Sequence, residues 1–257
     1  MKHRIIFFDV DGTITSHKDG TISQSTKQAI KKLLGNGLHV VAATGRPLSM
    51  CAEIIELGID TFITANGAYV THQGKCIHKI VLSHETVYRV NQFTSQQQHA
   101  LTYYSDTIHM NEVQNPKVQQ ALYETLGLQE FPSINSVAHL SETYLLCLFA
   151  DEVEIEKYKA QFPTINFKRW HPYIVNVLEE NVSKSVAIKK VLDYFGFTME
   201  EAIAFGDGEN DIDMLEIVDL GIAMGNANEK LKSSANFITK DSCEDGIVWA
   251  LKHFKLI

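Results

Sequence analysis

Residues 5–13 read "IIFFDVDGT", four consecutive apolar residues that lead directly into two aspartates, Asp9 and Asp11. A short, continuous apolar run is typical of a strand buried on both faces of a parallel sheet. Such sheets bind their ligands beyond the carboxyl ends of the strands. Because side chains alternate with a period of two, Asp9 and Asp11 start toward the same side. Two neighbouring carboxylates repel each other, so a cation or hydrogen bonds are needed to keep both of them ionised.

Strand and helix patterns alternate on both sides of the chain's middle. After the first strand, residues 24–37 and 47–58 have helical spacing, and residues 38–45 and 61–67 read as strands. The alternation resumes near the C-terminus, with helices predicted at 184–196, 210–218, 227–235 and 243–254 and strands at 202–208, 220–226 and 237–240. This alternation predicts an α/β fold in which a doubly wound parallel sheet carries helices on both faces.

The middle of the chain, residues 83–183, has a different pattern. Two neighbouring pairs of strand-like segments, residues 100–106 with 107–111 and 165–170 with 173–179, suggest hairpins and therefore an antiparallel sheet. Helix-like segments lie among them. We therefore predict an inserted α+β domain at 83–183, within a core domain made of residues 1–82 and 184–257.

A second acidic group follows another predicted strand. In "GDGEND", Asp207 and Asp211 come after the apolar segment "AIAF". Four carboxylates at one sheet edge, with oxygen ligands only, fit a hard cation such as Mg²⁺. A lone Asp-Gly after a strand is usually a turn, but a turn does not require Asp9 or a matching acidic turn after another strand. Neither segment has the ligand frame of a calcium-binding EF-hand loop.

Two further segments end at the same edge if the topology is right. Thr44 and Gly45 follow the second strand, where a hydroxyl and the adjacent amides can cradle a phosphate. A simple helix N-cap explains Thr44 equally well. Lys184 begins a predicted helix, where its charge opposes the helix dipole, so an anionic partner explains its position better than helix stability does. A solvated surface lysine is the alternative.

Composition excludes several classes of function. The chain has 257 residues, 45% of them hydrophobic, so it can bury a core and form two domains. Its formal net charge of −8 and the lack of a basic stripe argue against nucleic-acid binding. The four cysteines are far apart, and no segment reaches membrane-spanning length, so we expect a cytoplasmic protein with reduced thiols and no membrane partner. Oligomeric state cannot be predicted from these features.

Taken together, "DVDGT", "TGR", the Lys184 helix start and "GDGENDIDML" resemble the haloacid dehalogenase (HAD) superfamily of aspartate-nucleophile phosphatases. More narrowly, the chain looks like a Cof-type member, because that subfamily carries a large cap domain inserted where residues 83–183 lie. Asn66 and Gly67 in "TANGA" also match a segment common in this subfamily. The resemblance implies a Rossmann-like core and a Mg²⁺-dependent phosphatase.

The resemblance also implies roles for the candidate residues. Asp9 would be the nucleophile that forms an aspartyl-phosphate, and Asp11 the general acid and base. Mg²⁺ would be held by Asp9, by the main-chain carbonyl of Asp11 and by Asp207, with Asp211 bound directly or through water. The expected phosphate-binding residues are Thr44, Gly45, Lys184 and Asn210, of which Asn210 would orient Lys184 or the phosphoryl group.

Several functional alternatives remain open at this point. The substrate is expected to be a small phosphorylated metabolite, such as a sugar phosphate, a nucleotide or a cofactor phosphate. A phosphomutase would use the same nucleophile, and a receiver-like signalling module would keep the phosphorylated aspartate as its output. Specificity would reside in the cap domain, where Arg169 and His171 could contact an anionic or hydroxylated substrate. An ordinary hairpin turn around Pro172 is the preferred interpretation of that segment.

Overall fold

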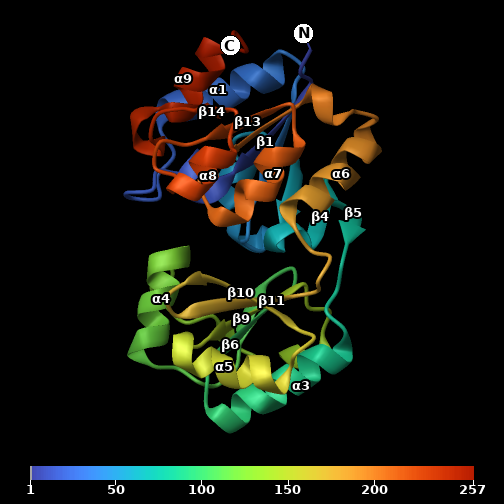
Figure 1. The fold of residues 1–257 in the computed structure, drawn as a ribbon, viewed down its shortest axis with the longest axis vertical. Coiled ribbons are helices and arrows are strands. Elements are labelled where there is room, and N and C mark those ends of the chain that lie inside the picture. Colours follow the sequence, from blue (N-terminus) through green and yellow to red (C-terminus); the bar gives the residue numbers. More distant parts are fainter. Residues whose placement is uncertain (1) are drawn as a thin grey trace. The chain divides into compact units, whose positions relative to one another are not determined.

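The structure is a computed structural model that describes residues 2–257 (Figure 1). It forms two compact units, which we describe separately. The core unit contains the described residues up to Gly45, Cys51–His78 and Ser183–Ile257, and the inserted unit contains Arg46–Met50 and Lys79–Val182. The inserted unit thus begins at Lys79, before the predicted boundary at residue 83. It also includes Arg46–Met50, which the sequence prediction places in the core domain.

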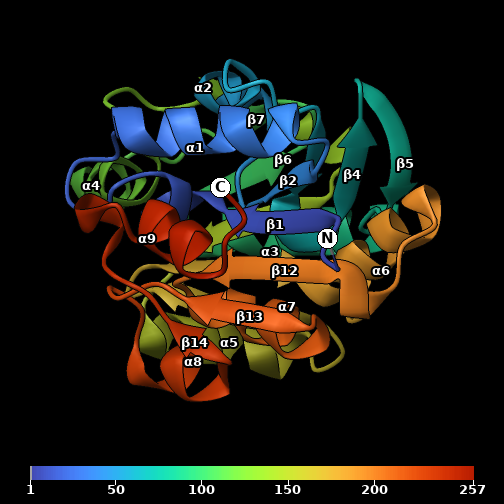
Figure 2. The same cartoon turned by 90° about the horizontal axis from the view of Figure 1, so that it is seen from above.

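The core unit is built on an eight-stranded sheet in the order β14-β13-β12-β1-β2-β3-β4-β5. Figure 2 shows β2, β1, β12 and β13 side by side. β1 pairs in parallel with both β12 and β2, so it lies in the middle of the sheet. The strands are β1 (Ile5–Asp9), β2 (His39–Ala43), β3 (Thr61–Thr64), β4 (Tyr69–His72), β5 (Lys75–Lys79), β12 (Ala202–Gly206), β13 (Leu220–Ala223) and β14 (Phe237–Ile238).

Helices cover both faces of this sheet, as a doubly wound fold requires. On one face, Ile5 and Phe7 of β1 pack in a hydrophobic core with side chains of α6, α7 and α8. Their alternating neighbours Ile6 and Phe8 are fully buried as well. Residues of α1 and α9 do not belong to the core formed with α6, α7 and α8; α1 packs on β2 and contacts α9. The helices are α1 (Gln24–Gly35), α2 (Ala52–Ile55), α6 (Lys184–Phe195), α7 (Ile212–Ile217), α8 (Glu229–Ser234) and α9 (Gly246–His253).

The fold class is confirmed, with two local differences. β4 and β5 extend the sheet beyond β3, and β4 pairs with β3 in antiparallel orientation, so the sheet is mixed rather than wholly parallel. The helix predicted at residues 47–58 is instead a 3-10 turn, Leu48–Met50, followed by the one-turn helix α2. Apolar spacing alone does not distinguish a continuous helix from two short turns, because both place residues three and four apart on one side.

The inserted unit has its own sheet, in the order β10-β11-β9-β6-β7-β8. Both predicted hairpins are present, since β6 pairs with β7 and β10 with β11 in antiparallel orientation. α3 and α5 cover one face and bury Val90 and Tyr158 against it. The elements are α3 (His84–Gln97), β6 (Leu101–Tyr104), β7 (Ile108–Met110), α4 (Pro116–Leu126), β8 (Ser133–Ile134), β9 (Leu145–Phe149), α5 (Glu152–Gln161), β10 (Asn166–His171) and β11 (Ile174–Leu178).

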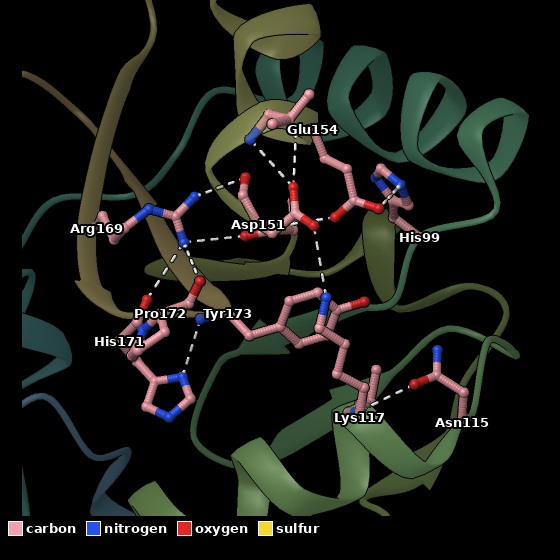
Figure 3. A network of polar contacts seen from close by, with 12 residues as sticks. His99, Asn115, Lys117, Asp151, Glu154, Arg169, His171, Pro172 and Tyr173 are labelled. Carbon is pink, nitrogen blue, oxygen red and sulfur yellow. Dashed lines mark hydrogen bonds and ion pairs between the residues drawn. The ribbon is translucent and has the colours of Figure 1, made fainter.

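The side chain of Arg169 stabilises the hairpin formed by β10 and β11 (Figure 3). Its guanidinium donates to the main-chain carbonyls of His171 and Pro172 in the hairpin turn. It also donates to those of Ala150 and Asp151, directly before α5. Its Nε lies 2.9 Å from a Glu152 carboxylate oxygen. These contacts tie the β10–β11 turn to the N-terminus of α5. A structural role for this segment, the preferred interpretation of the sequence, agrees with these contacts.

Among residues 2–257, no helix is long and apolar enough to cross a membrane.

Candidate active site

Asp9 and Asp11 lie where β1 ends and the chain turns sharply. Asp9 is the last residue of β1 and is only 6% exposed, whereas Asp11 is exposed. They are separated by Val10, the first residue of the irregular turn η1 (Val10–Ile14). Gly12 has a φ of 80°, and a Cβ at this position would collide with the carboxylate of Asp207. Glycine is therefore required here both by the backbone conformation and by the space.

Asp207 and Asp211 reach the same place from the neighbouring strand. Asp207 directly follows β12, and Asp211 ends the turn η6 (Glu209–Asp211). Each of Asp9, Asp207 and Asp211 offers a carboxylate oxygen, and these atoms all lie within 4.8 Å of one another. This geometry agrees with the prediction that distant acidic residues meet at this edge for three of the four predicted carboxylates, whereas the exposed Asp11 is not part of the group.

Lys184 is the cation of this cluster. It is the first residue of α6, which begins at the N-cap Ser183, and its side chain is 1% exposed. Its Nζ lies 2.5 Å from Asp9 Oδ1 and 2.6 Å from Asp211 Oδ1. An ammonium has three N–H donors, so one remains for a further anionic group.

Asp211 is a buried residue whose carboxylate holds several parts of the site in place. Its side chain is fully buried, and its Oδ2 accepts hydrogen bonds from the main-chain N–H of Asp207 at 3.0 Å and of Gly208 at 2.9 Å. Its other oxygen accepts from Lys184. Asp211 thus fixes both the loop that carries Asp207 and the ammonium that contacts Asp9.

The electrostatics of the cluster favour a further cation. Burial, together with the charge of Asp211, raises the pKa of Asp9 well above its ordinary value, although Lys184 opposes the shift. Burial and the charge of Asp211 likewise raise the pKa of Asp207 to about 7. Burial alone would lower the pKa of Lys184, but the charges of Asp211 and Asp9 outweigh it and raise that pKa above its ordinary value. One ammonium does not neutralise three carboxylates.

The donor set fits Mg²⁺. It consists of carboxylate oxygens, which hard cations prefer, and it carries more negative charge than Lys184 compensates. A bound divalent cation would supply the missing charge and keep Asp9 and Asp207 ionised at neutral pH.

Of the other predicted residues, Thr44 and Gly45 follow β2 and Asn210 lies in the turn η6. Thr44, directly after β2, is fully buried, and its main chain is hydrogen-bonded to Ile63 and to Asn66. A Cβ on Gly45 would lie 3.2 Å from the Asn66 amide group. Asn210 donates a hydrogen bond of 3.0 Å to Asn66 Oδ1, whereas Lys184 is oriented by Asp9 and Asp211. Asn210 is therefore linked to the Thr44 loop through Asn66.

Two residues of the site were not predicted. Thr13 donates to Asp207 Oδ1 at 2.9 Å, and Asn226 donates to Asp207 Oδ2 at 3.1 Å and to the carbonyl of Gly12 at 2.9 Å. Together they fix both oxygens of Asp207. A signal for Asn226 was present in the sequence, because it is the polar last residue of the predicted strand 220–226, whose carboxyl end meets the same edge.

A family match covers almost the whole chain. Residues 6–251 match the family described as haloacid dehalogenase-like hydrolase, and the chain belongs to this family. The resemblance inferred from "DVDGT" and "GDGENDIDML" is thereby confirmed.

Several similar proteins match this chain over nearly their whole length. The protein named "Putative phosphatase YkrA" of Bacillus subtilis strain 168 is 35% identical over all of both chains. The 5-amino-6-(5-phospho-D-ribitylamino)uracil phosphatase YcsE of the same strain is 29% identical over 98% of this chain and 96% of its own. The solved structure of the HAD subclass IIB sugar phosphatase BT4131 is similar with a TM-score of 0.88 and 32% identity, over 99% of this chain and all of that one.

Proposed function

We propose that the protein is a Mg²⁺-dependent phosphatase that hydrolyses small phosphorylated metabolites through an aspartyl-phosphate intermediate. The observation that carries the proposal is the position of Asp9. Its carboxylate contacts a buried lysine and lies within 4.8 Å of two further carboxylates, while the exposed Asp11 follows two residues later. The names of the relatives, which include a sugar phosphatase and a ribitylaminouracil phosphatase, support the substrate class.

Asp9 would act as the nucleophile. One of its carboxylate oxygens forms a bond to phosphorus while the bond between phosphorus and the leaving oxygen breaks. Lys184 fixes the orientation of the Asp9 carboxylate through its 2.5 Å contact, and its remaining N–H can bind a phosphoryl oxygen. Thr44, Gly45 and Asn210 would hold the other phosphoryl oxygens.

Asp11 would serve as acid and then as base. It first gives a proton to the leaving oxygen, and then takes one from the water whose oxygen attacks phosphorus and releases Asp9. Its exposure leaves it accessible to both the leaving group and the water. Asp9, the main-chain carbonyl of Asp11 and Asp207, with Asp211 directly or through water, would hold Mg²⁺, which supplies positive charge for the approach of carboxylate and phosphate.

A phosphatase assay over a panel of phosphorylated metabolites, with Mg²⁺ or with EDTA and ranked by kcat/KM, tests the proposal. We expect Mg²⁺-dependent release of inorganic phosphate and at least about a thousandfold loss of kcat in Asp9→Asn. Asp219→Asn is a matched control, because Asp219 is an acidic residue of the same unit that pairs with Lys2 and His3.

Two results would contradict the proposal. One is wild-type hydrolysis of p-nitrophenyl phosphate by Asp9→Asn. The other is transfer of phosphate between positions of a hexose phosphate without release of inorganic phosphate, which would indicate a phosphomutase.

We also propose that the protein works in the cytoplasm, since all four of its cysteines are free thiols.

A further inference from the structure

A second group of metal-ligand side chains lies in the core unit, and the proposed phosphatase mechanism gives it no role. His17, Asp241 and Cys243 each offer one ligand atom, and these atoms all lie within 4.8 Å of one another. His17 and Cys243 are exposed and Asp241 is half-buried. An ion can therefore reach this group, which we call the His17 cluster, directly from solvent.

Two chain segments far apart in the sequence are fixed against each other at the His17 cluster. The main-chain N–H of His17 donates to Ser242 Oγ at 3.0 Å, and its imidazole Nδ1 lies 3.1 Å from the same oxygen. On the other side, the main-chain N–H groups of Glu244 and Gly246 both donate to the carbonyl of Asp241. These hydrogen bonds thus hold the backbone segments that carry the three side chains next to each other before any ion binds.

The ligand chemistry of this cluster differs from that of the catalytic group. An imidazole nitrogen, a thiolate sulfur and a carboxylate oxygen suit a borderline-soft cation, whereas the carboxylates around Asp9 suit Mg²⁺. Zn²⁺ binds such ligands at about 2.0–2.3 Å, so atoms sharing one tetrahedral ion lie roughly 3–4 Å apart. The observed spacing, within 4.8 Å, is at most about 1 Å above this range. We propose that His17, Asp241 and Cys243 form a zinc site with a solvent molecule in the fourth position.

This site is linked to the catalytic carboxylates by hydrogen bonds. Ser242, between two of the ligands, donates its main-chain N–H to Asn226 Oδ1 at 2.9 Å. Asn226 in turn donates to Asp207 Oδ2 and to the carbonyl of Gly12. A zinc ion at the His17 cluster therefore holds in place the segment that positions Asp207.

Titration with Co²⁺ in the presence of excess Mg²⁺ tests the proposal without using activity. Mg²⁺ occupies the all-oxygen group, and Co²⁺ bound to a thiolate gives a charge-transfer absorption that oxygen ligands do not give. We expect this absorption in the wild-type protein and in Cys76→Ser, and its loss in Cys243→Ser. Cys76 is the matched control because it is the other exposed thiol of the core unit. His17→Gln should keep the thiolate but bind Co²⁺ at least about tenfold more weakly.

A second measurement does not depend on any variant. Zn²⁺, but not Mg²⁺, should slow alkylation of Cys243 in the wild-type protein, and it should leave the rate at Cys76 unchanged. The proposal is overturned if the wild type gives no thiolate absorption, if the absorption survives in Cys243→Ser, or if Zn²⁺ protects both exposed cysteines equally.

Discussion

At the scale of single residues, the site depends on the balance between Lys184 and three buried or partly buried carboxylates. Lys184 and Asp211 are both almost completely removed from water. Removing one partner of such a pair leaves a buried charge without compensation, which typically costs about 3–5 kcal/mol. The pair therefore belongs to the fold as much as to the chemistry, because it fixes the position of Asp9 before any substrate binds.

The raised pKa of Asp207 predicts how stability depends on pH in the metal-free protein. Since this pKa is about 7 in the folded chain and near 3.8 when unfolded, the folded state binds more protons between these values. Stability in EDTA should therefore fall as the pH rises from about 4 to about 7. Asp207→Asn cannot ionise, so it should gain stability relative to wild type as the pH rises through this window, by up to about 4 kcal/mol or roughly 8–16 °C in melting temperature.

The slope of stability against pH, measured by thermal unfolding, is the quantity to compare. Thr13 and Asn226 both donate to Asp207, so an amide at this position loses a hydrogen bond at every pH and shifts the whole curve. Asp219→Asn is the control, because hydrogen bonds from Lys2 and His3 lower the pKa of Asp219, so its contribution to stability changes only below this window and the slope within it should match that of wild type. Parallel curves for wild type and Asp207→Asn would contradict the prediction. Saturating Mg²⁺ should remove the difference in slope.

Which site residues the sequence predicts follows from where each one lies relative to a strand. Asp9 is the last residue of one apolar strand and Asp207 directly follows another, and the edge where they meet is set by the parallel topology. Lys184 was predicted from its place at a helix start. Thr13 and Asn226 were missed because they act by donating hydrogen bonds to Asp207, and a single hydroxyl or amide has no spacing pattern that marks such a contact, although Asn226 stands at the end of a predicted strand.

At the scale of elements, the turn after β1 is the part of the fold that tolerates least change. Gly12→Ala should destabilise the protein by at least about 1 kcal/mol, because a positive φ strains any residue with a Cβ. The added Cβ would also push the Asp207 carboxylate away, so Mg²⁺ should bind more weakly. Urea unfolding in EDTA measures the first effect, and the rise in melting temperature on adding Mg²⁺ measures the second.

Gly35→Ala is the matched control for this element. Gly35 ends α1, and a Cβ there would meet nothing within 4 Å. Alanine should therefore be neutral or stabilise by up to about 1 kcal/mol, with Mg²⁺ binding unchanged. Equal effects of the two substitutions would show that the turn at Gly12 has no special requirement for glycine.

The elements that the sequence did not predict share a physical cause. β4 and β5 form a hairpin around Gln73 and Gly74, both at positive φ, where the short flanking strands carry mixed polar and apolar residues. β5 lies at the sheet edge and has no buried residue, and in the four-residue β4 only Val70 and Thr71 are buried, so neither strand gives an unbroken apolar run. In contrast, β1 and β12 lie inside the sheet, are buried throughout, and were predicted from unbroken apolar runs.

At the scale of the whole molecule, the two units have separate hydrophobic cores. Ile5 and Phe7 belong to the core of the first unit, and Val90 and Tyr158 to that of the second. All residues of the proposed phosphatase site come from the core unit, although the chain leaves that unit and returns to it between β5 and α6. The change of pattern at the middle of the sequence therefore reflects a second core.

This separation predicts that the fragment Lys79–Val182 folds on its own. It contains the complete six-stranded sheet, both helices that cover it, the capping box of α5 at Asp151 and the Arg169 contacts that tie a hairpin to that helix. A core of this kind is typical of domains of about 100 residues. We expect a single cooperative unfolding transition in urea and a melting temperature that Mg²⁺ does not change. Under the same conditions Mg²⁺ at about a hundred times its Kd should stabilise the full chain by about 3 kcal/mol. A fragment that unfolds gradually, or one whose melting temperature rises with Mg²⁺, would show that the inserted unit depends on the core unit for its fold or takes part in binding the metal.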